Sequence, residues 1–155
     1  MPYVNCDIRK PPFEHGSMEE IQAIHCFEHF PRWEAVSILM QWRRILKPKG
    51  LLVLEMPCLN MIIDILHEHR TPDSIPSVWY KLPDGRTVNK HIDAMGGLYG
   101  EQDPKKPDML HKWCYSSEEI REVLESAGFT NILFKDPLFH RPFRDMRIEM
   151  RKWRK

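Results

Sequence analysis

The feature that most constrains the fold is an almost unbroken apolar run, Leu51–Met56, which lies between Gly50 and Pro57. A short apolar run bounded by turn residues is typical of a strand that is covered on both faces of a parallel sheet. Before it, after Pro31, apolar residues recur at helical spacing and predict an amphipathic helix that ends at Gly50. The apolar positions of this helix are Trp33, Val36, Leu39, Met40, Trp42 and Ile45.

Two further strands are predicted ahead of this helix. Val4–Ile8 is the first candidate and ends before two prolines, and Glu20–His25 is the second. Strand, helix and buried strand in succession define an α/β unit with a right-handed crossover.

The second half of the chain predicts a helix over Asn60–His69 and another that begins at Ser116, with hydroxyl caps followed by acidic residues. Two strands close the chain, Thr130–Phe134 and Met146–Met150, and we expect them to form an antiparallel hairpin. The predicted fold is therefore α/β, a truncated Rossmann-like doubly wound sheet that is mostly parallel and ends in an antiparallel hairpin.

Residues 70–112 show the least regular pattern of what we take to be a single domain, 1–155. The region is rich in proline and contains the cluster Gly96-Gly97-Leu98-Tyr99-Gly100. A long segment between regular elements is typically a lid or binding loop, so we expect one here. The glycine cluster follows no apolar strand, and we interpret it as a turn of this lid rather than a phosphate-binding loop.

Composition excludes several classes of protein. With 23 basic and 22 acidic residues the formal net charge is +1, which gives no indication of a nucleic-acid or membrane partner. The apolar runs are too short to span a bilayer. The four cysteines, at positions 6, 26, 58 and 114, form no Cys-x-x-Cys pair, and from the polar residues after Met1 we expect no secretory signal. We expect reduced thiols in a cytoplasmic protein.

Several stretches, taken in order, resemble the class I S-adenosylmethionine-dependent methyltransferases of the methyltransferase-11 type. They are Asp7-Ile8-Arg9-Lys10-Pro11-Pro12-Phe13, Glu20-Ile21, His25-Cys26-Phe27-Glu28-His29-Phe30, Trp42 to Gly50 with its Lys47-Pro48-Lys49-Gly50 end, and Glu125-Ser126-Ala127-Gly128-Phe129. The resemblance covers nearly the whole chain.

The resemblance implies an S-adenosyl-L-methionine site at the carboxyl ends of the first strands, where ligands bind in open α/β sheets. It assigns Asp7 and Ile8 to the adenine, and His25, Cys26 and Phe27 to the border of the methionine part, with His29 toward the acceptor. From the residues alone, Asp7 is equally well explained as an Asx turn before the prolines.

The family's glycine-rich cofactor loop, of the type Gly-x-Gly-x-Gly, has no counterpart ahead of Asp7. We therefore expect an N-terminally truncated chain with weak or absent cofactor binding. We also expect an exposed apolar sheet edge, through which the chain would form a homodimer or larger assembly.

No residue is an obligatory catalyst for methyl transfer, since alignment supplies much of the rate. The candidates are His29, Tyr99 and His111, while Trp113 and Tyr115 are expected to anchor the lid. A Cys26 nucleophile paired with His29 or His111 is weighed against an inert thiol, which is the commoner case.

Metal-ligand residue types also occur near the second strand. They are His25, Cys26 and His29, with Cys58 and the run His67-Glu68-His69. Their spacing matches no established zinc signature, so we predict no metal site.

The leading function is a methyltransferase acting on a small-molecule or otherwise unknown acceptor, with a cofactor site that the missing N-terminal part is expected to impair. The alternative is a non-catalytic methyltransferase-like interaction or assembly module, or the C-terminal portion of a split enzyme.

Overall fold

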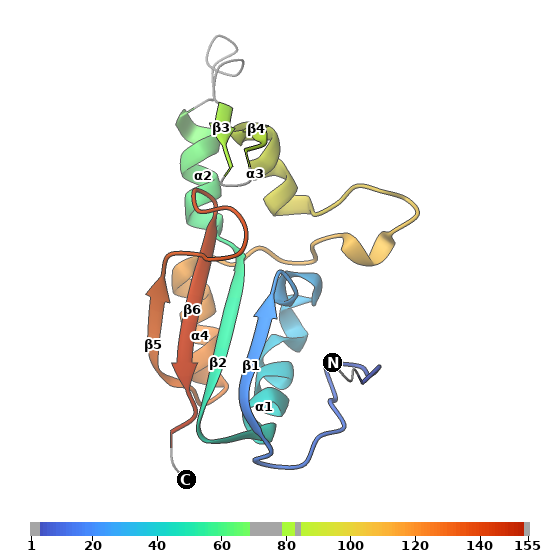
Figure 1. The fold of residues 1–155 in the computed structure, drawn as a ribbon, viewed down its shortest axis with the longest axis vertical. Coiled ribbons are helices and arrows are strands. Elements are labelled where there is room, and N and C mark those ends of the chain that lie inside the picture. The colour runs from blue at the N-terminus through green and yellow to red at the C-terminus, as the bar shows by residue number, and fades with distance from the viewer. Residues whose placement is uncertain (1–3, 69–78, 83–84, 154–155) are drawn as a thin grey trace.

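A computed structural model describes residues 4–68, 79–82 and 85–153, and Figure 1 shows their arrangement. A four-stranded sheet has the order β1-β2-β6-β5, and a smaller two-stranded sheet joins β3 to β4. The elements are β1 Met18–Ile24, α1 Ala35–Ile45, β2 Leu46–Pro57, α2 Leu59–Glu68, β3 Trp79–Lys81, β4 Thr87–Asn89, α3 Lys90–Tyr99, α4 Ser117–Ser126, β5 Thr130–Lys135 and β6 Asp145–Arg151. Short 3-10 helices cover Phe27–His29, Arg32–Glu34 and Pro107–Met109.

The sheet confirms the predicted Rossmann-like α/β fold with its antiparallel terminal hairpin. β1 runs parallel to β2, with Ala23 opposite Leu54. β6 is antiparallel to both β2 and β5, so β1, β2 and β5 share one direction. The apolar run that predicted a buried strand is the centre of β2, where Leu52, Val53 and Leu54 are fully buried.

The main core lies between the sheet and the helices α1 and α4, which pack on the same face (Figure 1). Leu39 and Trp42 of α1 and Leu124 of α4 enter this core, where burial of each large side chain contributes about 1.5–3 kcal/mol. The helical spacing predicted that Trp33 and Met40 would lie on the buried face, but Trp33 is 82% exposed and Met40 is 55% exposed. Both lie on the solvent side of the α1 region, which the apolar pattern alone does not distinguish.

The predicted strand Val4–Ile8 is wrong. Residues 4–17 form no strand; they run as irregular chain along α1, and the indole Nε1 of Trp42 donates to the carbonyl of Ile8 at 2.7 Å. A strand needs a partner for its backbone groups. Among the described residues no strand lies on this side of β1, so side chains of α1 satisfy part of this segment instead.

The region 70–112 is more regular than a loop. Residues 70–78 and 83–84 lie outside the described part, but the remainder holds the β3–β4 hairpin and α3. The Asn89 side chain caps α3 by accepting from the backbone of His91 and Ile92. Gly96 and Gly97 therefore lie within a helix rather than in a lid turn, which corrects our interpretation of the glycine cluster.

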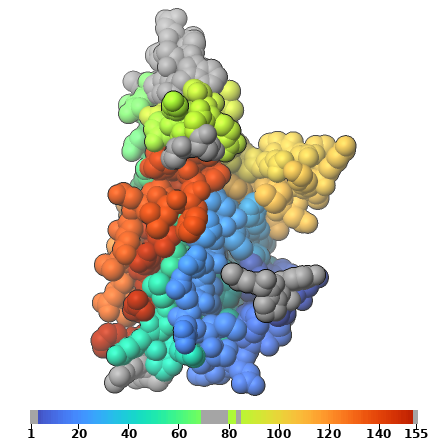
Figure 2. Space-filling model, viewed as in Figure 1, coloured from blue at the N-terminus to red at the C-terminus, as the bar shows by residue number. Residues whose placement is uncertain are grey.

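Close packing explains why α3 contains Gly97. A Cβ at this position would lie 2.8 Å from Arg144 Cδ and 2.8 Å from Ile62 Cδ1, closer than real contacts allow. The helices α2 and α3 pack through Ile62, Ile65 and Ala94 as a second, smaller cluster. Figure 2 shows this unit above one end of the sheet, with the segment after α3 projecting beside it. None of the helices in the described residues is long and apolar enough to cross a membrane.

Candidate functional site

A polar cavity of about 600 Å³ opens at the carboxyl end of β1, between the sheet and α3. Histidines from three segments line it, namely His25, His29, His111 and His140. Arg141 and Arg144 add two guanidinium groups. The carboxyl ends of parallel strands are where open α/β sheets bind ligands, so this cavity is the candidate functional site.

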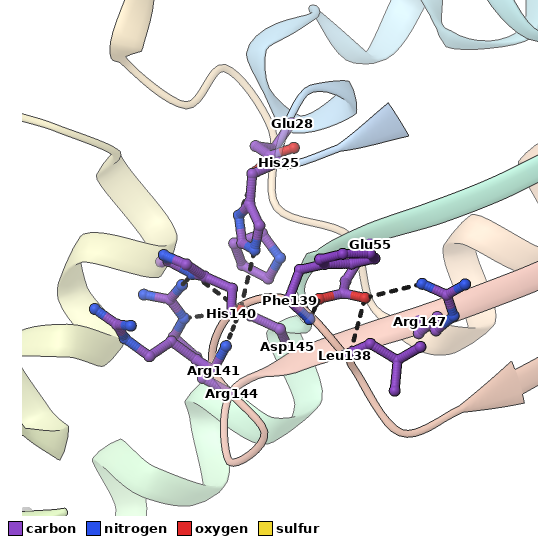
Figure 3. Close-up of polar contacts among 12 residues, drawn as sticks. His25, Glu28, Glu55, Leu138, Phe139, His140, Arg141, Arg144, Asp145 and Arg147 are labelled. Atoms are coloured by element: carbon purple, nitrogen blue, oxygen red, sulfur yellow. Dashed lines mark hydrogen bonds and ion pairs between the residues drawn. The ribbon is translucent and has the colours of Figure 1, made fainter. Parts of the chain in front are cut away.

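His25 lies at the centre of the site and directly follows the last residue of β1. Its φ of 46° is unusual for a residue other than glycine, and its backbone N–H donates to the Glu55 carbonyl at 2.8 Å. The turn directs the imidazole between two carboxylates (Figure 3). Nδ1 lies 3.0 Å from Oε1 of Glu28, and Nε2 forms an ion pair at 3.1 Å with Oδ2 of Asp145.

These carboxylates set the charge of His25. Burial alone would lower the pKa of the imidazole, but Asp145 and then Glu28 outweigh it and raise the pKa to about 9. His25 is therefore an imidazolium at neutral pH. Burial opposes ionisation of Asp145, but His140, His25 and Arg144 hold its pKa far below the ordinary value.

Arg144 connects this cluster to α3. Its Nε donates to Oδ1 of Asp145 at 2.8 Å, and its Nη1 donates to the backbone carbonyl of Asp93 at 2.7 Å. The Asp93 carboxylate also accepts from Nε of Arg141 at 3.0 Å. Only 4% of Arg144 is exposed, so these contacts compensate a guanidinium removed from water.

A second buried ion pair orders the loop that carries His140. Glu55 is fully buried and lies 3.2 Å from Nη1 of Arg147. Its carboxylate also accepts backbone N–H groups from Leu138 at 3.0 Å and Phe139 at 2.7 Å (Figure 3). Glu55 therefore positions the loop that covers the end of β2.

His29 and His111 lie side by side, with ring centroids 4.8 Å apart. Nδ1 of His29 contacts the Leu110 carbonyl at 3.1 Å, and Nδ1 of His111 contacts the Gly97 carbonyl at 2.8 Å. Burial lowers the pKa of His111. Two of the three predicted catalytic candidates thus share one wall of the cavity. The third, Tyr99, has a side chain that is 55% exposed, and its carbonyl accepts from His111 N–H at 3.2 Å.

The five predicted cofactor residues are distributed over different places. Ile8 and Cys26 line an apolar cavity of about 380 Å³ beside β1, whereas His25 lines the polar cavity. The Asp7 carboxylate forms an Asx turn, accepting from Arg9 N–H at 3.0 Å, and pairs with its guanidinium at 2.9 Å. The Phe27 side chain is fully buried and stacks on Tyr115. The structure therefore does not bring Asp7 and His25 into one cavity.

The remaining candidates from the sequence are the cysteines, the aromatic residues Trp113 and Tyr115, and the other residues of metal-ligand type. Burial raises the pKa of Cys26 to about 11 and that of Cys114 to about 12, which favours the inert-thiol interpretation. Tyr115 is buried, as expected of an anchor, whereas Trp113 is 41% exposed and only its Nε1 is held, donating to Glu119 at 3.0 Å. His69 lies outside the described residues, and Cys58 and His67 belong to neither potential metal cluster in the described part.

Sequence reasoning missed the residues that bind His25. Glu28 entered the analysis only within the stretch His25-Cys26-Phe27-Glu28-His29-Phe30, and His140, Arg144 and Asp145 were given no role. Glu28 is three positions from His25. His140, Arg144 and Asp145 are far from His25 in the sequence, and only the pairing of β2 with β6 brings them close to it. The one signal available in the sequence was the pair Arg144-Asp145, a basic and an acidic residue directly before the predicted strand Met146–Met150.

The fold is Rossmann-like, and comparisons with known proteins relate it to methyltransferases. Residues 1–54 match the family model of the methyltransferase domain, Methyltransf_11. Together with the solved structures below, this match supports the resemblance to class I S-adenosylmethionine-dependent methyltransferases. A comparison with curated proteins gives no match.

Three solved structures illustrate the likeness. A possible exported protein from Bordetella parapertussis has a TM-score of 0.61 at 18% identity, over 96% of this chain and 43% of that one. An S-adenosylmethionine-dependent methyltransferase from Methanosarcina mazei has a TM-score of 0.56 at 15% identity, over 96% and 66%. Burkholderia thailandensis 1,6-didemethyltoxoflavin-N1-methyltransferase, with bound 1,6-didemethyltoxoflavin and S-adenosylhomocysteine, has a TM-score of 0.55 at 13% identity, over 97% and 50%. The chain thus spans about two fifths to two thirds of these structures.

Proposed function

We propose that this protein is an S-adenosylmethionine-dependent methyltransferase, in which the polar cavity at the end of β1 receives the methyl acceptor. The observation that carries the proposal is the position of this cavity, at the carboxyl ends of two parallel strands in a methyltransferase fold. His29 and His111 line it, and a neutral imidazole there can accept a proton from an acceptor heteroatom. The acceptor is a small molecule or another group yet to be identified.

The cofactor pocket that residues 1–155 supply is partial. The apolar cavity lined by Ile8 and Cys26 has the chemistry that a heterocyclic ring prefers, and Asp7 lies close by in the chain. We assign Asp7 and Ile8 to the adenine, and His25, Cys26 and Phe27 to the border of the methionine part, with Phe27 acting by packing. Because these groups occupy separate places, we propose that residues 1–155 alone bind the cofactor weakly.

The four free cysteines agree with a cytoplasmic location.

A second candidate function is a non-catalytic assembly module, or the C-terminal portion of a split enzyme. The apolar cavity favours it, since Ile21, Ile24 and Trp42 line this hollow beside β1, a strand that pairs on one side only among the described residues. A chain from another molecule would cover this edge.

Calorimetric titration of the chain with S-adenosylhomocysteine, combined with assays for methyl transfer to candidate acceptors, separates the two functions. Binding of S-adenosylhomocysteine, with turnover that His111→Asn lowers, supports the methyltransferase. No heat of binding and no turnover, in a chain shown to be folded by circular dichroism, supports the assembly module.

A further inference from the structure

Three potential metal ligands meet where the 3-10 helix Phe27–His29 touches the segment after α3. They are Glu28, His29 and His111, and one ligand atom from each lies within 4.8 Å of the others. Two backbone bonds hold the segments together, because the Glu28 carbonyl accepts from Lys112 N–H at 2.9 Å and from Trp113 N–H at 3.2 Å. The three side chains are therefore placed by rigid backbone contacts.

Both imidazoles are oriented as metal ligands usually are. Each directs Nδ1 at a backbone carbonyl, Leu110 for His29 at 3.1 Å and Gly97 for His111 at 2.8 Å. A carbonyl can only accept, so Nδ1 carries a proton, and in the neutral imidazole Nε2 then keeps a free lone pair. This arrangement, with a carbonyl holding the far nitrogen, is the one that surrounds histidine ligands in metalloproteins.

Glu28 gives an independent indication of a missing ligand. Its side chain is 1% exposed. Oε1 accepts from His25 Nδ1 at 3.0 Å and lies 3.9 Å from Nε2 of His111. Oε2 is buried and has no hydrogen-bond partner among the described residues. A buried carboxylate oxygen without a partner is costly, and a cation would remove that cost.

A second group of metal-ligand types, His25, His140 and Asp145, does not offer the same opportunity. Both nitrogens of His25 face carboxylates, and Nη2 of Arg144 lies 3.3 Å from Nδ1 of His140. The Arg144 guanidinium also contacts Asp145 at 2.8 Å. The imidazolium of His25 and the guanidinium of Arg144 already occupy the positions that a metal ion would take.

We propose that Glu28, His29 and His111 bind a divalent first-row transition-metal ion, such as Zn²⁺, Fe²⁺ or Co²⁺. Two imidazoles and one carboxylate suit these ions better than Mg²⁺ or Ca²⁺, which prefer oxygen ligands. Ligand distances of about 2.0–2.2 Å place donor atoms roughly 3.3 Å apart, so the present separation closes by small side-chain movements. Three protein ligands leave a position open, and the polar cavity lined by His29 and His111 would supply it with an oxygen or nitrogen ligand.

This proposal reverses the prediction from sequence, which considered His25, Cys26 and His29 but not Glu28 or His111. It goes beyond the proposed function, because the site is defined without the cofactor and its test needs no methyl transfer. An ion bound there would take the lone pairs of His29 and His111, so the metal-bound state and the proton-accepting state of these imidazoles are alternatives.

The test is titration of the EDTA-treated full chain with ZnCl₂ by calorimetry and with CoCl₂ by visible absorption, without S-adenosylmethionine. We expect one ion per chain with a micromolar or tighter Kd, and Co²⁺ ligand-field bands. Glu28→Gln, His29→Gln and His111→Asn should each raise Kd by at least about tenfold. His67→Gln, which alters an exposed histidine of α2, should leave Kd unchanged.

Two outcomes would overturn the proposal: no ion bound by the wild-type chain, or binding that the three ligand variants share undiminished. Circular dichroism in EDTA checks that each variant folds, and His29→Gln, at a partly exposed side chain, decides the matter if Glu28→Gln does not fold. A chain that binds the ion but transfers no methyl group refutes the proposed function and leaves the metal site intact.

Discussion

Nε2 of His25, just beyond the end of β1, lies 3.1 Å from Oδ2 of Asp145, the first residue of β6. The contact joins the first and last strands of the sheet across β2, which lies between them. It also places a positive imidazolium and a negative carboxylate below the polar cavity. The charge of this site therefore depends on the ends of two strands that never pair directly.

Replacement of Asp145 by Asn should destabilise the protein, because His25 and Arg144 would lose their buried counter-charge. We expect the free energy of unfolding at pH 7 to fall by about 3–5 kcal/mol. The folded-state pKa of Asp145 is lowered, so its contribution is present above the unfolded pKa and is lost as the pH falls through the folded one. Urea denaturation should thus show the difference between wild type and Asp145→Asn narrowing below about pH 4. A difference that stays constant down to pH 2.5 would contradict this assignment.

The central strand supplies a direct test of the core. Leu54 in β2 is fully buried, whereas Leu133 in β5 is 57% exposed. We expect Leu54→Ala to cost about 2–5 kcal/mol in urea denaturation, since it leaves a cavity. Leu133→Ala, the same change on the same sheet, should stay within about 1 kcal/mol of wild type. Equal effects would mean that the face of β2 toward α1 and α4 is not the main core.

Asp7 distinguishes a ligand-binding role from a purely local one. If it accepts from the adenine amino group, Asp7→Ala should weaken S-adenosylhomocysteine binding about tenfold without altering the melting temperature by more than a few degrees. Glu14→Ala, at another exposed acid of the same segment, is the matched control. Unchanged affinity in Asp7→Ala would leave the Asx turn and the Arg9 ion pair as the whole role of this carboxylate.

In the part of the chain that the structure describes, β1 pairs on one side only, and its other edge predicts self-association. We expect light scattering after size exclusion to give a dimer or larger species at micromolar concentration. Gln22 is exposed on β1, and a lysine there is the kind of charge that blocks edge pairing, so Gln22→Lys should shift the mass toward the monomer. Glu122→Lys, at an exposed residue of α4, should not shift it. A monomeric wild-type chain would refute the prediction.

Much of the fold followed from local patterns. The apolar run Leu51–Met56, the helix before it and the Ser116 cap each satisfy their own backbone and apolar requirements within a short stretch. Val4–Ile8 failed because a strand depends on a neighbour, and the sequence of the segment does not reveal whether one is present. Helix α3 was missed because its glycines lower helix propensity, and the close contact with Arg144 that requires Gly97 is a tertiary property.

The candidate site was predictable to a lesser degree. His25, His29 and His111 were selected from sequence, and the structure brings all three to one cavity. Their carboxylate partners were not selected, because Glu28 sits in a 3-10 turn and Asp145 reaches His25 only through strand order. Residue type indicates chemical capacity, but pairing across the sheet decides which groups meet.

Arg144 grips α3 with one nitrogen and the start of β6 with another, and a Cβ on Gly97 would collide with its side chain. The guanidinium therefore links the unit formed by α2 and α3 to the sheet. Any tilt of α3 that widens the mouth of the cavity must also pull on Asp145, and hence on the counter-charge of His25. The Arg144 side chain therefore couples access to the polar cavity with the charges of His25 and Asp145 at its base.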